Sequence, residues 1–464
     1  MQQLNVLFSK TFKEDATSIQ KIAESGSNRR YQRMYGSSFS VIGVYGESIR
    51  ENKAFIAMSQ HFKQCNINVP RVLAVSEDFH YYITDDLGQI SLFDCLNQKD
   101  ILPLLQKTIS KLPVIQFEAG KTLDYSVCFP QSEFNKRTVF WDLNYFKYEF
   151  LKPSGIEFDE ELLENEFELM SDILLKENDN TFMYRDFQSR NVMIKDGEPW
   201  FIDFQGGRKG PIYYDLASFI YQAKAKFSED TKESLIKTYL EALKPYRDIS
   251  FDKFKKEFSY FVLFRVLQTL GAYGFRGLIE HKSHFIQSIP YAIANLKQTL
   301  NTYSFSEFPY LKKLLEQLIN KYQISETTDS DQLIVRVFSF SYKKGIPDDY
   351  SGNGGGFVFD CRALHNPGRY DEYKQLTGLD KPVIDFIENN GEMQLFLNNV
   401  FAIADSSVER YIKRGFTNLM FSFGCTGGRH RSVYAAQKLA EHISKKYGVK
   451  VALTHREQSI MTSL

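Results

Sequence analysis

Residues 184–191 read Tyr-Arg-Asp-Phe-Gln-Ser-Arg-Asn, and residues 201–204 read Phe-Ile-Asp-Phe. The residues between the two stretches form apolar runs on either side of Asp-Gly-Glu-Pro, which is the composition of a β-hairpin closed by a tight turn. Asp186 and Asn191 stand before this hairpin, and Asp203 stands at its end. Because a hairpin brings its two ends together, the spacing predicts that these three side chains share one site.

The three side chains match the needs of phosphoryl transfer from a nucleotide. In that chemistry one carboxylate orients the attacking hydroxyl, while an Asn and a second Asp hold magnesium against the phosphates. We therefore predict that Asp186 is the catalytic residue, that Asn191 and Asp203 bind the metal, and that ATP and Mg²⁺ are the cofactors. The structural alternative is that these residues only cap turns and end a strand, as Asp and Asn often do.

Four further segments carry a family resemblance. They are Gly-Ser-Asn-Arg-Arg-Tyr-Gln-Arg at 26–33, Ile-Thr-Asp-Asp-Leu-Gly at 83–88, Ile-Asp-Phe-Gln at 202–205 and Tyr-Asp-Leu-Ala at 214–217. They resemble the phosphate loop, the adenine hinge, the metal loop and the following helix of the aminoglycoside phosphotransferase and choline kinase superfamily. The resemblance is strongest to its N-acetylmuramate and N-acetylglucosamine kinases, and it covers roughly the first two thirds of the chain.

The resemblance implies an α+β, protein-kinase-like bilobal domain. It also implies an ATP-dependent kinase that phosphorylates a sugar hydroxyl, with an amino sugar or a muramic acid derivative as the small-molecule acceptor. The residues that it places at ATP are Ser27, Asn28, Arg29, Arg30, Arg33, Glu51, Asp85 and Asp86.

Two positions depart from the family pattern. Tyr184 stands where many relatives have His, a change expected to remove a hydrogen bond that braces the loop but no catalytic group. The strand at 39–45 lacks the Lys that contacts the phosphates in protein kinases. One of the three arginines named above, braced by Glu51, is expected to supply that charge; the alternatives are a solvated strand face or a kinase-like domain that binds nucleotide without turnover.

The acceptor pocket has a weaker signal. Residues 141–148, Trp-Asp-Leu-Asn-Tyr-Phe-Lys-Tyr, mix aromatic and polar groups in a way that suits a sugar, although an amphipathic helix that packs its aromatics inward has the same composition. Arg208, Arg265 and Gln268 are also candidates for the cleft, but the sequence gives their side chains no direction.

Composition limits the class of protein. The 464 residues exceed what one core usually fills, so two or three domains are expected, and the formal net charge is zero. There is no run of about 18 apolar residues and no signal-peptide pattern at the start, so we expect a cytoplasmic protein without a membrane segment. The five cysteines are scattered, which predicts neither a disulfide framework nor a zinc site.

The chain has a polar stretch at 324–332 that lies between a predicted helix and a predicted strand. We therefore predict a kinase domain over residues 1–320, a linker over 321–332 and a smaller α/β domain over 333–464. This last domain has 17 Lys and Arg against 13 Asp and Glu, which is a small positive excess.

A second motif lies in the last domain. Residues 421–432 read Phe-Ser-Phe-Gly-Cys-Thr-Gly-Gly-Arg-His-Arg-Ser, which predicts a strand, a glycine turn and the start of a helix. Backbone N–H groups that converge at a helix N-terminus bind anions, and nearby Arg and Ser side chains strengthen such a site. The residues predicted to bind a sugar phosphate are Asp360, Cys425, Thr426, Gly427, Gly428, His430, Arg431 and Ser432.

The same domain resembles the C-terminal domain of RapZ-type RNase adaptor proteins. The matching segments are 339–347, 359–362, 376–382 and 424–434. The resemblance implies binding of an amino-sugar phosphate, and in some members binding of a regulatory RNA or assembly into multimers. The charge excess is too small and too spread for the clustered basic surface that RNA binding needs, so RNA is the less favoured partner, while a homo-oligomer stays open.

Cys425 and Arg431 also have the Cys-x5-Arg spacing of cysteine phosphatases, in which a thiolate attacks phosphorus. A phosphatase also needs a general acid, which the sequence does not place. The favoured interpretation is a sugar kinase fused to a domain that senses a sugar phosphate. The fusion suggests feedback, in which the kinase product or a downstream hexosamine phosphate binds the last domain. The alternatives are a sensor or adaptor of weak catalytic power that acts on RNA or a protein, and a bifunctional kinase and phosphatase.

Overall fold

The computed structural model describes residues 2–22, 29–176, 181–280, 282–323, 333–347, 349, 355–389 and 391–464. The chain forms two compact units, one of residues 1–272 and 291–319 and the other of residues 273–290 and 320–464. Residues 273–290 group with the second unit, although we expected them in the first domain, so the predicted domain limits stay a prediction. In the described residues no helix has the length and apolar character to span a membrane.

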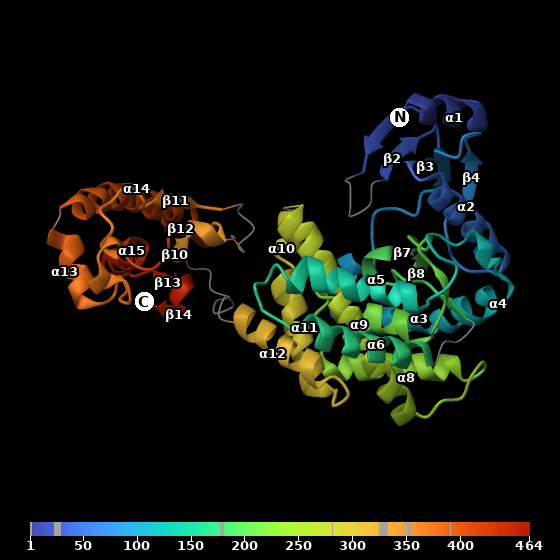
Figure 1. Cartoon of the computed structure of the whole chain (residues 1–464). Helices are drawn as coiled ribbons and strands as arrows, with labels where there is room; N and C mark the ends of the chain where they lie inside the picture. The colour runs from blue at the N-terminus through green and yellow to red at the C-terminus, as the bar shows by residue number, and fades with distance from the viewer. Residues whose placement is uncertain are drawn as a thin grey trace. The chain divides into compact units, whose positions relative to one another are not determined.

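The first unit begins with an antiparallel sheet whose strand order is β1-β2-β3-β5-β4 (Figure 1). The strands are β1 (Ser18–Lys21), β2 (Arg30–Tyr35), β3 (Ser40–Tyr45), β4 (Val72–Val75) and β5 (Tyr81–Asp85), and the helices are α1 (Gln2–Phe12) and α2 (Ile49–Gln64). Leu4 and Phe8 of α1 pack against buried residues of the sheet, which anchors this helix. Ser48 caps α2 through a hydrogen bond from the backbone of Glu51.

The rest of the first unit is mainly helical. Its helices are α3 (Leu102–Ser110), α4 (Gly120–Thr122), α5 (Lys136–Phe146), α6 (Glu160–Lys176), α7 (Tyr213–Ile220), α8 (Glu229–Leu243), α9 (Phe251–Tyr273), α11 (Ile289–Thr302) and α12 (Pro309–Gln323), and the short α10 (Ser283–Ile286) falls in the second unit. Apolar residues at helical spacing predict α6, α9, α11 and α12, and the structure confirms them within a few residues. The bilobal kinase-like α+β fold is thus confirmed.

The first unit also has two small antiparallel sheets of two strands each. One pairs β6 (Thr181–Met183) with β9 (Arg208–Gly210), and the other pairs β7 (Val192–Lys195) with β8 (Glu198–Phe201). The second is the predicted hairpin. Its turn residues Asp196 and Gly197 have φ of 53° and 71°, the left-handed conformation that a tight two-residue hairpin turn requires.

The second unit has a five-stranded sheet with the order β11-β12-β10-β13-β14. The strands β10 (Ile334–Ser341), β11 (Phe357–Asp360), β12 (Asn418–Cys425) and β13 (Lys450–His455) are parallel, and β14 (Ile460–Ser463) is antiparallel. The helices are α13 (Lys381–Asn389), α14 (Glu392–Arg414) and α15 (Arg431–Tyr447). This is the smaller α/β domain that the sequence predicts.

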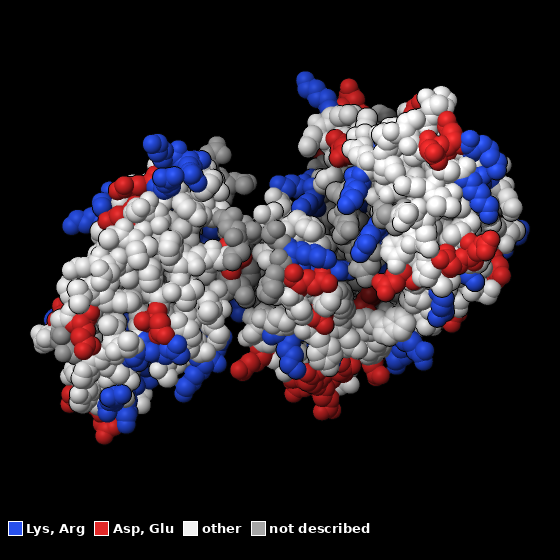
Figure 2. Space-filling model, turned by 90° about the horizontal axis from the view of Figure 1, so that it is seen from above, with Lys and Arg blue, Asp and Glu red and all other residues white. Residues whose placement is uncertain are grey.

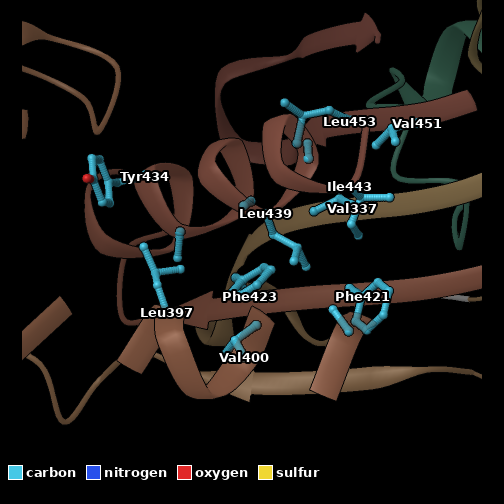
Figure 3. Packing of buried hydrophobic residues seen from close by; sticks show 14 of the residues in the cluster. Val337, Leu397, Val400, Phe421, Phe423, Tyr434, Leu439, Ile443, Val451 and Leu453 are labelled. Carbon is cyan, nitrogen blue, oxygen red and sulfur yellow. The ribbon is translucent and has the colours of Figure 1, made fainter. Parts of the chain in front are cut away.

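Apolar side chains cover both faces of this sheet (Figure 3). Leu397 and Val400 of α14 lie against one face, and Leu439 and Ile443 of α15 lie against the other. Because both faces are covered, the central strands β10 and β12 are buried at most positions, as parallel strands usually are. This packing holds the start of α15 close to the end of β12. The glycine turn that joins them therefore lies at the carboxyl edge of the sheet.

Candidate functional site

The loop that follows β6 is held by Asp215 of α7. The Asp215 carboxylate accepts the backbone N–H of Tyr184 at 2.7 Å and the backbone N–H of Arg185 at 2.9 Å. Burial raises the pKa of Asp215 to about 7, although these two hydrogen bonds oppose the shift. Arg185 has a φ of 81°, an unfavourable conformation for a residue with a side chain, and the two bonds to Asp215 stabilise it.

Tyr184 also ties this loop to the metal loop. Its hydroxyl donates a hydrogen bond of 2.6 Å to the carbonyl oxygen of Ile202, the residue before Asp203. The expectation that a Tyr at this position removes a bracing hydrogen bond is therefore wrong. The phenol is long enough to reach the backbone of the other segment, which a sequence comparison of side-chain types does not reveal.

Asp186, Asn191 and Asp203 come together as their spacing predicts. Asn191 Nδ2 donates to the Asp186 carbonyl oxygen at 2.8 Å and to Asp203 Oδ2 at 3.2 Å. Gln205 Nε2 donates to the other Asp203 oxygen at 2.7 Å. Burial, together with the charge of the neighbouring Asp186, raises the pKa of Asp203.

This donor set fits a magnesium ion. Carboxylate and amide oxygens are hard ligands of the kind that Mg²⁺ prefers, and nucleotide phosphates normally complete its coordination. A cation held by Asp203 would also offset the burial and the charge of Asp186 that raise the pKa of Asp203. In the described part of the chain there is no group of three or more His, Cys, Asp and Glu placed to hold a metal without such help.

Arg29 makes the ion pair that connects the sheet to this site. Its Nη2 lies 3.2 Å from Glu51 Oε1, and its side chain is only 4% exposed. Gln205 Nε2 lies 3.5 Å from the same Glu51 oxygen, so Arg29, Glu51, Gln205 and Asp203 follow one another in space. In protein kinases a strand Lys pairs with a helix Glu in this role. Here the ion pair joins Arg29, which precedes β2, to Glu51 of α2.

The other predicted ATP contacts lie elsewhere in the lobe or outside the described residues. Arg33 forms two hydrogen bonds with Asp86, at 2.6 and 3.1 Å, and a third with the Gly88 carbonyl oxygen. Asp85 pairs with Arg71 at 2.9 Å, and Arg30 is exposed above the Tyr45 ring. Ser27 and Asn28 fall outside the described residues, and the predicted roles of all these residues stay predictions.

Other residues of the site carried only a weak signal or none in the sequence. The predicted acceptor segment 141–148 lies mainly on α5, where Trp141 and Tyr148 are each 47% exposed. Asp142 of the same helix is buried and pairs with Arg185 Nη2 at 2.7 Å. Asp215 and Gln205 stand inside motifs that the sequence singles out, yet their partners are fixed only by the tertiary structure.

In the second unit, the glycine turn after β12 folds around Cys425. The thiol of Cys425 accepts the Gly428 backbone N–H at 3.2 Å and lies 3.1 Å from Ser432 Oγ. Gly428 has a φ of 64°, and a Cβ there would lie 2.4 Å from Glu457 Cγ, so a side chain does not fit. A Cβ at Gly427 would meet nothing within 4 Å. The turn is therefore tightly packed on one side and open on the other.

Arg431 lies beneath the turn. It is 4% exposed, and its Nη1 donates to the carbonyl oxygens of Arg362 and Leu364 at 2.9 and 2.7 Å. A hydrogen bond from Arg362, aided by the charge of Arg431, lowers the pKa of Asp360, which follows the neighbouring strand. His430 instead bonds to the Tyr373 carbonyl oxygen at 2.9 Å. Thr426 is exposed at the rim, where its carbonyl oxygen accepts from Ser341.

Charged side chains on the second unit form small separate groups on the face that Figure 2 shows, with Asp, Glu and uncharged residues between them. Among the described residues on this face, Lys and Arg form no continuous band of the kind that tracks a nucleic-acid backbone.

Comparisons with known proteins agree with the two-part organisation. Residues 333–459 match the RapZ C-terminal domain. A nucleotide-binding protein of Lactobacillus helveticus is 42% identical over 125 residues, which cover 27% of this chain and 40% of that protein. One from Xylella fastidiosa is 39% identical over 130 residues, which cover 28% and 43%. The chain thus spans about two fifths of the length of these curated relatives.

Solved structures with a similar fold include the choline kinase LicA of Streptococcus pneumoniae, with 12% identity, a TM-score of 0.46 and coverage of 65% of this chain and 99% of that one. Another is ADP-bound aminoglycoside phosphotransferase APH(2'')-Ib, with 13% identity, a TM-score of 0.45 and coverage of 69% and 97%. These similarities say nothing about the substrate. Residues 18–251, about half of the chain, match the phosphotransferase enzyme family, and the chain belongs to that family.

Proposed function

We propose that the first unit is an ATP-dependent kinase that phosphorylates a sugar hydroxyl, with an amino sugar or a muramic acid derivative as acceptor. The observation that carries the proposal is the convergence of Asp186, Asn191 and Asp203, with the Arg29–Glu51 pair linked to them through Gln205. A positioned base, two metal-binding side chains and a phosphate-binding cation are the parts that phosphoryl transfer needs.

Each residue has a distinct role in this proposal. The Asp186 carboxylate orients the acceptor hydroxyl and accepts its proton. Asn191 and Asp203 hold Mg²⁺, which when bound neutralises charge on the phosphates. Arg29 reaches the phosphates from the sheet, and Asp215 holds the loop that carries Asp186. The alternative, a sensor of weak catalytic power, rested on the missing strand Lys, and the Arg29–Glu51 pair favours the enzyme.

We also propose that the second unit binds an amino-sugar phosphate at the turn from Cys425 to Ser432. Support comes from Arg431, a buried guanidinium whose Nη1 donates to two carbonyl oxygens, and from the open space beside Gly427. A phosphate at the rim would gain the charge of Arg431 and the dipole of α15. The kinase product, or a hexosamine phosphate made from it, would then report on the flux through the first unit. RNA and a second copy of the chain stay as further candidate partners.

Two measurements test the proposal. ADP release from Mg-ATP is followed with N-acetylglucosamine, N-acetylmuramate, glucosamine, choline and an aminoglycoside, and turnover is expected with a sugar and not with choline. Calorimetric titration of the intact chain with glucosamine 6-phosphate tests the second unit, with inorganic phosphate and glucosamine as controls. Turnover on choline alone would contradict the sugar assignment, and equal binding of phosphate and the sugar phosphate would reduce the second site to a simple anion site.

A further inference from the structure

Three arginines, of which Arg208 and Arg265 are buried and Arg185 is largely buried, meet around Tyr214 beside the predicted base. Arg185 precedes Asp186 in the chain, Arg208 lies on β9, and Arg265 lies on α9. The guanidinium carbons of Arg185 and Arg265 lie 5.1 and 6.0 Å from the centre of the Tyr214 ring. Arg208 donates two hydrogen bonds to the Gly206 carbonyl oxygen, at 3.2 and 3.0 Å, in the segment between Asp203 and β9. We call these three residues the arginine cluster.

The arginine cluster carries more positive charge than its surroundings balance. Arg185 is paired with Asp142. Arg208 and Arg265 are 5% and 7% exposed, and neither has a carboxylate partner in the described part of the chain. Arg265 donates to neutral groups, the side chains of Ser218, Gln268 and Thr269. A charge buried without a counter-ion is costly, and buried charges in proteins are therefore usually paired.

The pKa of Arg208 reflects this imbalance. Burial lowers it to about 10, and the positive charge of Arg185 adds to the effect, while Asp142 opposes it. The Asp215 carboxylate is engaged by the backbone N–H groups of Tyr184 and Arg185. Asp186, whose charge also acts on Arg185, must receive the proton of the acceptor in the proposed reaction. An anion beside the cluster would stabilise the charged form of Arg208 without using Asp186.

Unsatisfied polar atoms mark where such an anion would bind. Arg185 Nη1, Asp142 Oδ2 and the Tyr214 hydroxyl are all buried, and none of the three has a hydrogen-bond partner. Buried polar atoms in native proteins are nearly always bonded, so three together call for a ligand or bound water. The backbone close by is loosely packed at Gly206, where a Cβ would lie at the ordinary contact distances of 3.8 Å from Asp186 Oδ2 and 3.9 Å from Arg185 Cγ.

We propose that the arginine cluster binds a negatively charged substituent of the acceptor, a carboxylate or a phosphate, and thereby places the accepting hydroxyl at Asp186. The inference rests on the proposed kinase function and narrows its substrate class to anionic acceptors. Guanidinium groups match the two oxygens of a carboxylate or phosphate in charge and in geometry. A neutral acceptor would leave the cluster unpaired, so the site discriminates against it in the way that buried polar groups reject a ligand lacking their partner.

The test compares acceptors that differ in one charged group, using the intact chain. N-acetylglucosamine is neutral, N-acetylmuramate adds a carboxylate to the same ring, and N-acetylglucosamine 6-phosphate adds a phosphate. We expect kcat/KM for one of the anionic sugars to exceed that for the neutral one by about 30-fold or more, since losing the partner of a buried charge has at least that effect. The preferred anion then identifies which of the two groups the cluster binds.

Variants of the arginine cluster test whether it causes the preference for an anionic sugar. Arg208→Gln and Arg265→Gln should lower the preference for the anionic sugar mainly through its KM, and Arg208→Lys should retain part of it. Arg137→Gln is the matched control, because Arg137 is an exposed residue of α5, the helix that carries Asp142. Thermal melting and ATP titration show whether each variant is folded. If a variant fails to fold, the comparison of the three sugars with the unchanged chain still decides the question.

Two results would overturn the inference. If the neutral sugar is phosphorylated as well as the anionic ones, the cluster is structural, and the proposed kinase function still stands. The same conclusion follows if Arg208→Gln lowers kcat/KM equally for all three sugars. If the chain turns over none of the sugars, both the kinase function and the inference that rests on it are wrong.

Discussion

Arg29 lies 3.2 Å from Glu51, across the gap between the start of β2 and the first turn of α2. In the proposed kinase, this ion pair supplies the buried cation that takes the place of the missing strand Lys. An arginine does so from a different position in the chain. The geometry also separates Arg29 from Arg33, whose guanidinium is bonded to Asp86 and Gly88 at the hinge.

Arg29→Gln should raise the KM for ATP by about 10- to 100-fold, because it removes a charge-assisted interaction of that strength. Arg33→Gln should have a smaller effect on the KM for ATP, since Arg33 already has protein partners. Initial rates at varied Mg-ATP measure both variants. A larger rise in the KM for ATP with Arg33→Gln than with Arg29→Gln would show that Arg33, and not Arg29, contacts the phosphates.

Asp215→Asn should lower kcat by about 10- to 100-fold with little change in ATP affinity. An Asn side chain has one oxygen, so one of the N–H groups of Tyr184 and Arg185 would lose its acceptor, at a cost of about 1–3 kcal/mol. The loop that carries Asp186 would then be less well positioned. Asp196→Asn, in the exposed turn between β7 and β8, is the control and should leave kcat unchanged.

The comparison of sequence and structure shows which features local patterns determine. The hairpin of β7 and β8 follows from an apolar pair of strands and a turn of Asp196 and Gly197, so the convergence of Asp186, Asn191 and Asp203 was predictable. The bonds from Tyr184 and Arg185 to Asp215 depend on where α7 packs, and no local pattern encodes that.

The partners of the arginines were likewise not predictable from local sequence patterns. Arg29, Arg30 and Arg33 lie in one short stretch of the sequence, and only the packing of the sheet against α2 and the hinge gives their side chains different partners. Arg208 and Arg265 are 57 residues apart and carry no shared motif, so their meeting at Tyr214 became visible only in three dimensions.

His455 should make the second unit sensitive to acid. It is buried, its ring lies 2.9 Å from Ser339 Oγ and 3.2 Å from Gln437 Oε1, and burial lowers its pKa to about 4. In the unfolded chain the His455 ring binds a proton near pH 6.5, whereas in the folded unit it does so only near pH 4. Its contribution to stability is complete above pH 6.5 and is lost as the pH falls toward 4, by about 2 kcal/mol at pH 5.

Calorimetric unfolding of the intact chain between pH 7.5 and pH 5 measures this effect. His455→Gln should reduce the loss of stability on acidification, whereas His365→Gln, at an exposed position, should not. An unchanged pH dependence in His455→Gln would show that other groups cause the acid sensitivity.

Cys425 should resist alkylation in the folded protein. It is 3% exposed, and its sulfur is engaged by Gly428 and Ser432. Brief iodoacetamide treatment followed by peptide mass spectrometry should modify Cys65, which is partly exposed, before Cys425. Rapid modification of Cys425 that phosphate prevents would instead support the bifunctional kinase and phosphatase, because a catalytic thiolate is reactive and accessible.

The most direct test of the central claim is ADP release by the intact chain and by Asp186→Asn, measured with the sugar that gives the highest rate. The substitution keeps the size of the side chain but removes its basicity. We predict that kcat falls by about 10²- to 10⁴-fold while Mg-ATP still binds, because a positioned base contributes that much. Equal turnover by both proteins, or ATP binding without turnover in the unchanged chain, would contradict the assignment of Asp186 as the catalytic base of a kinase.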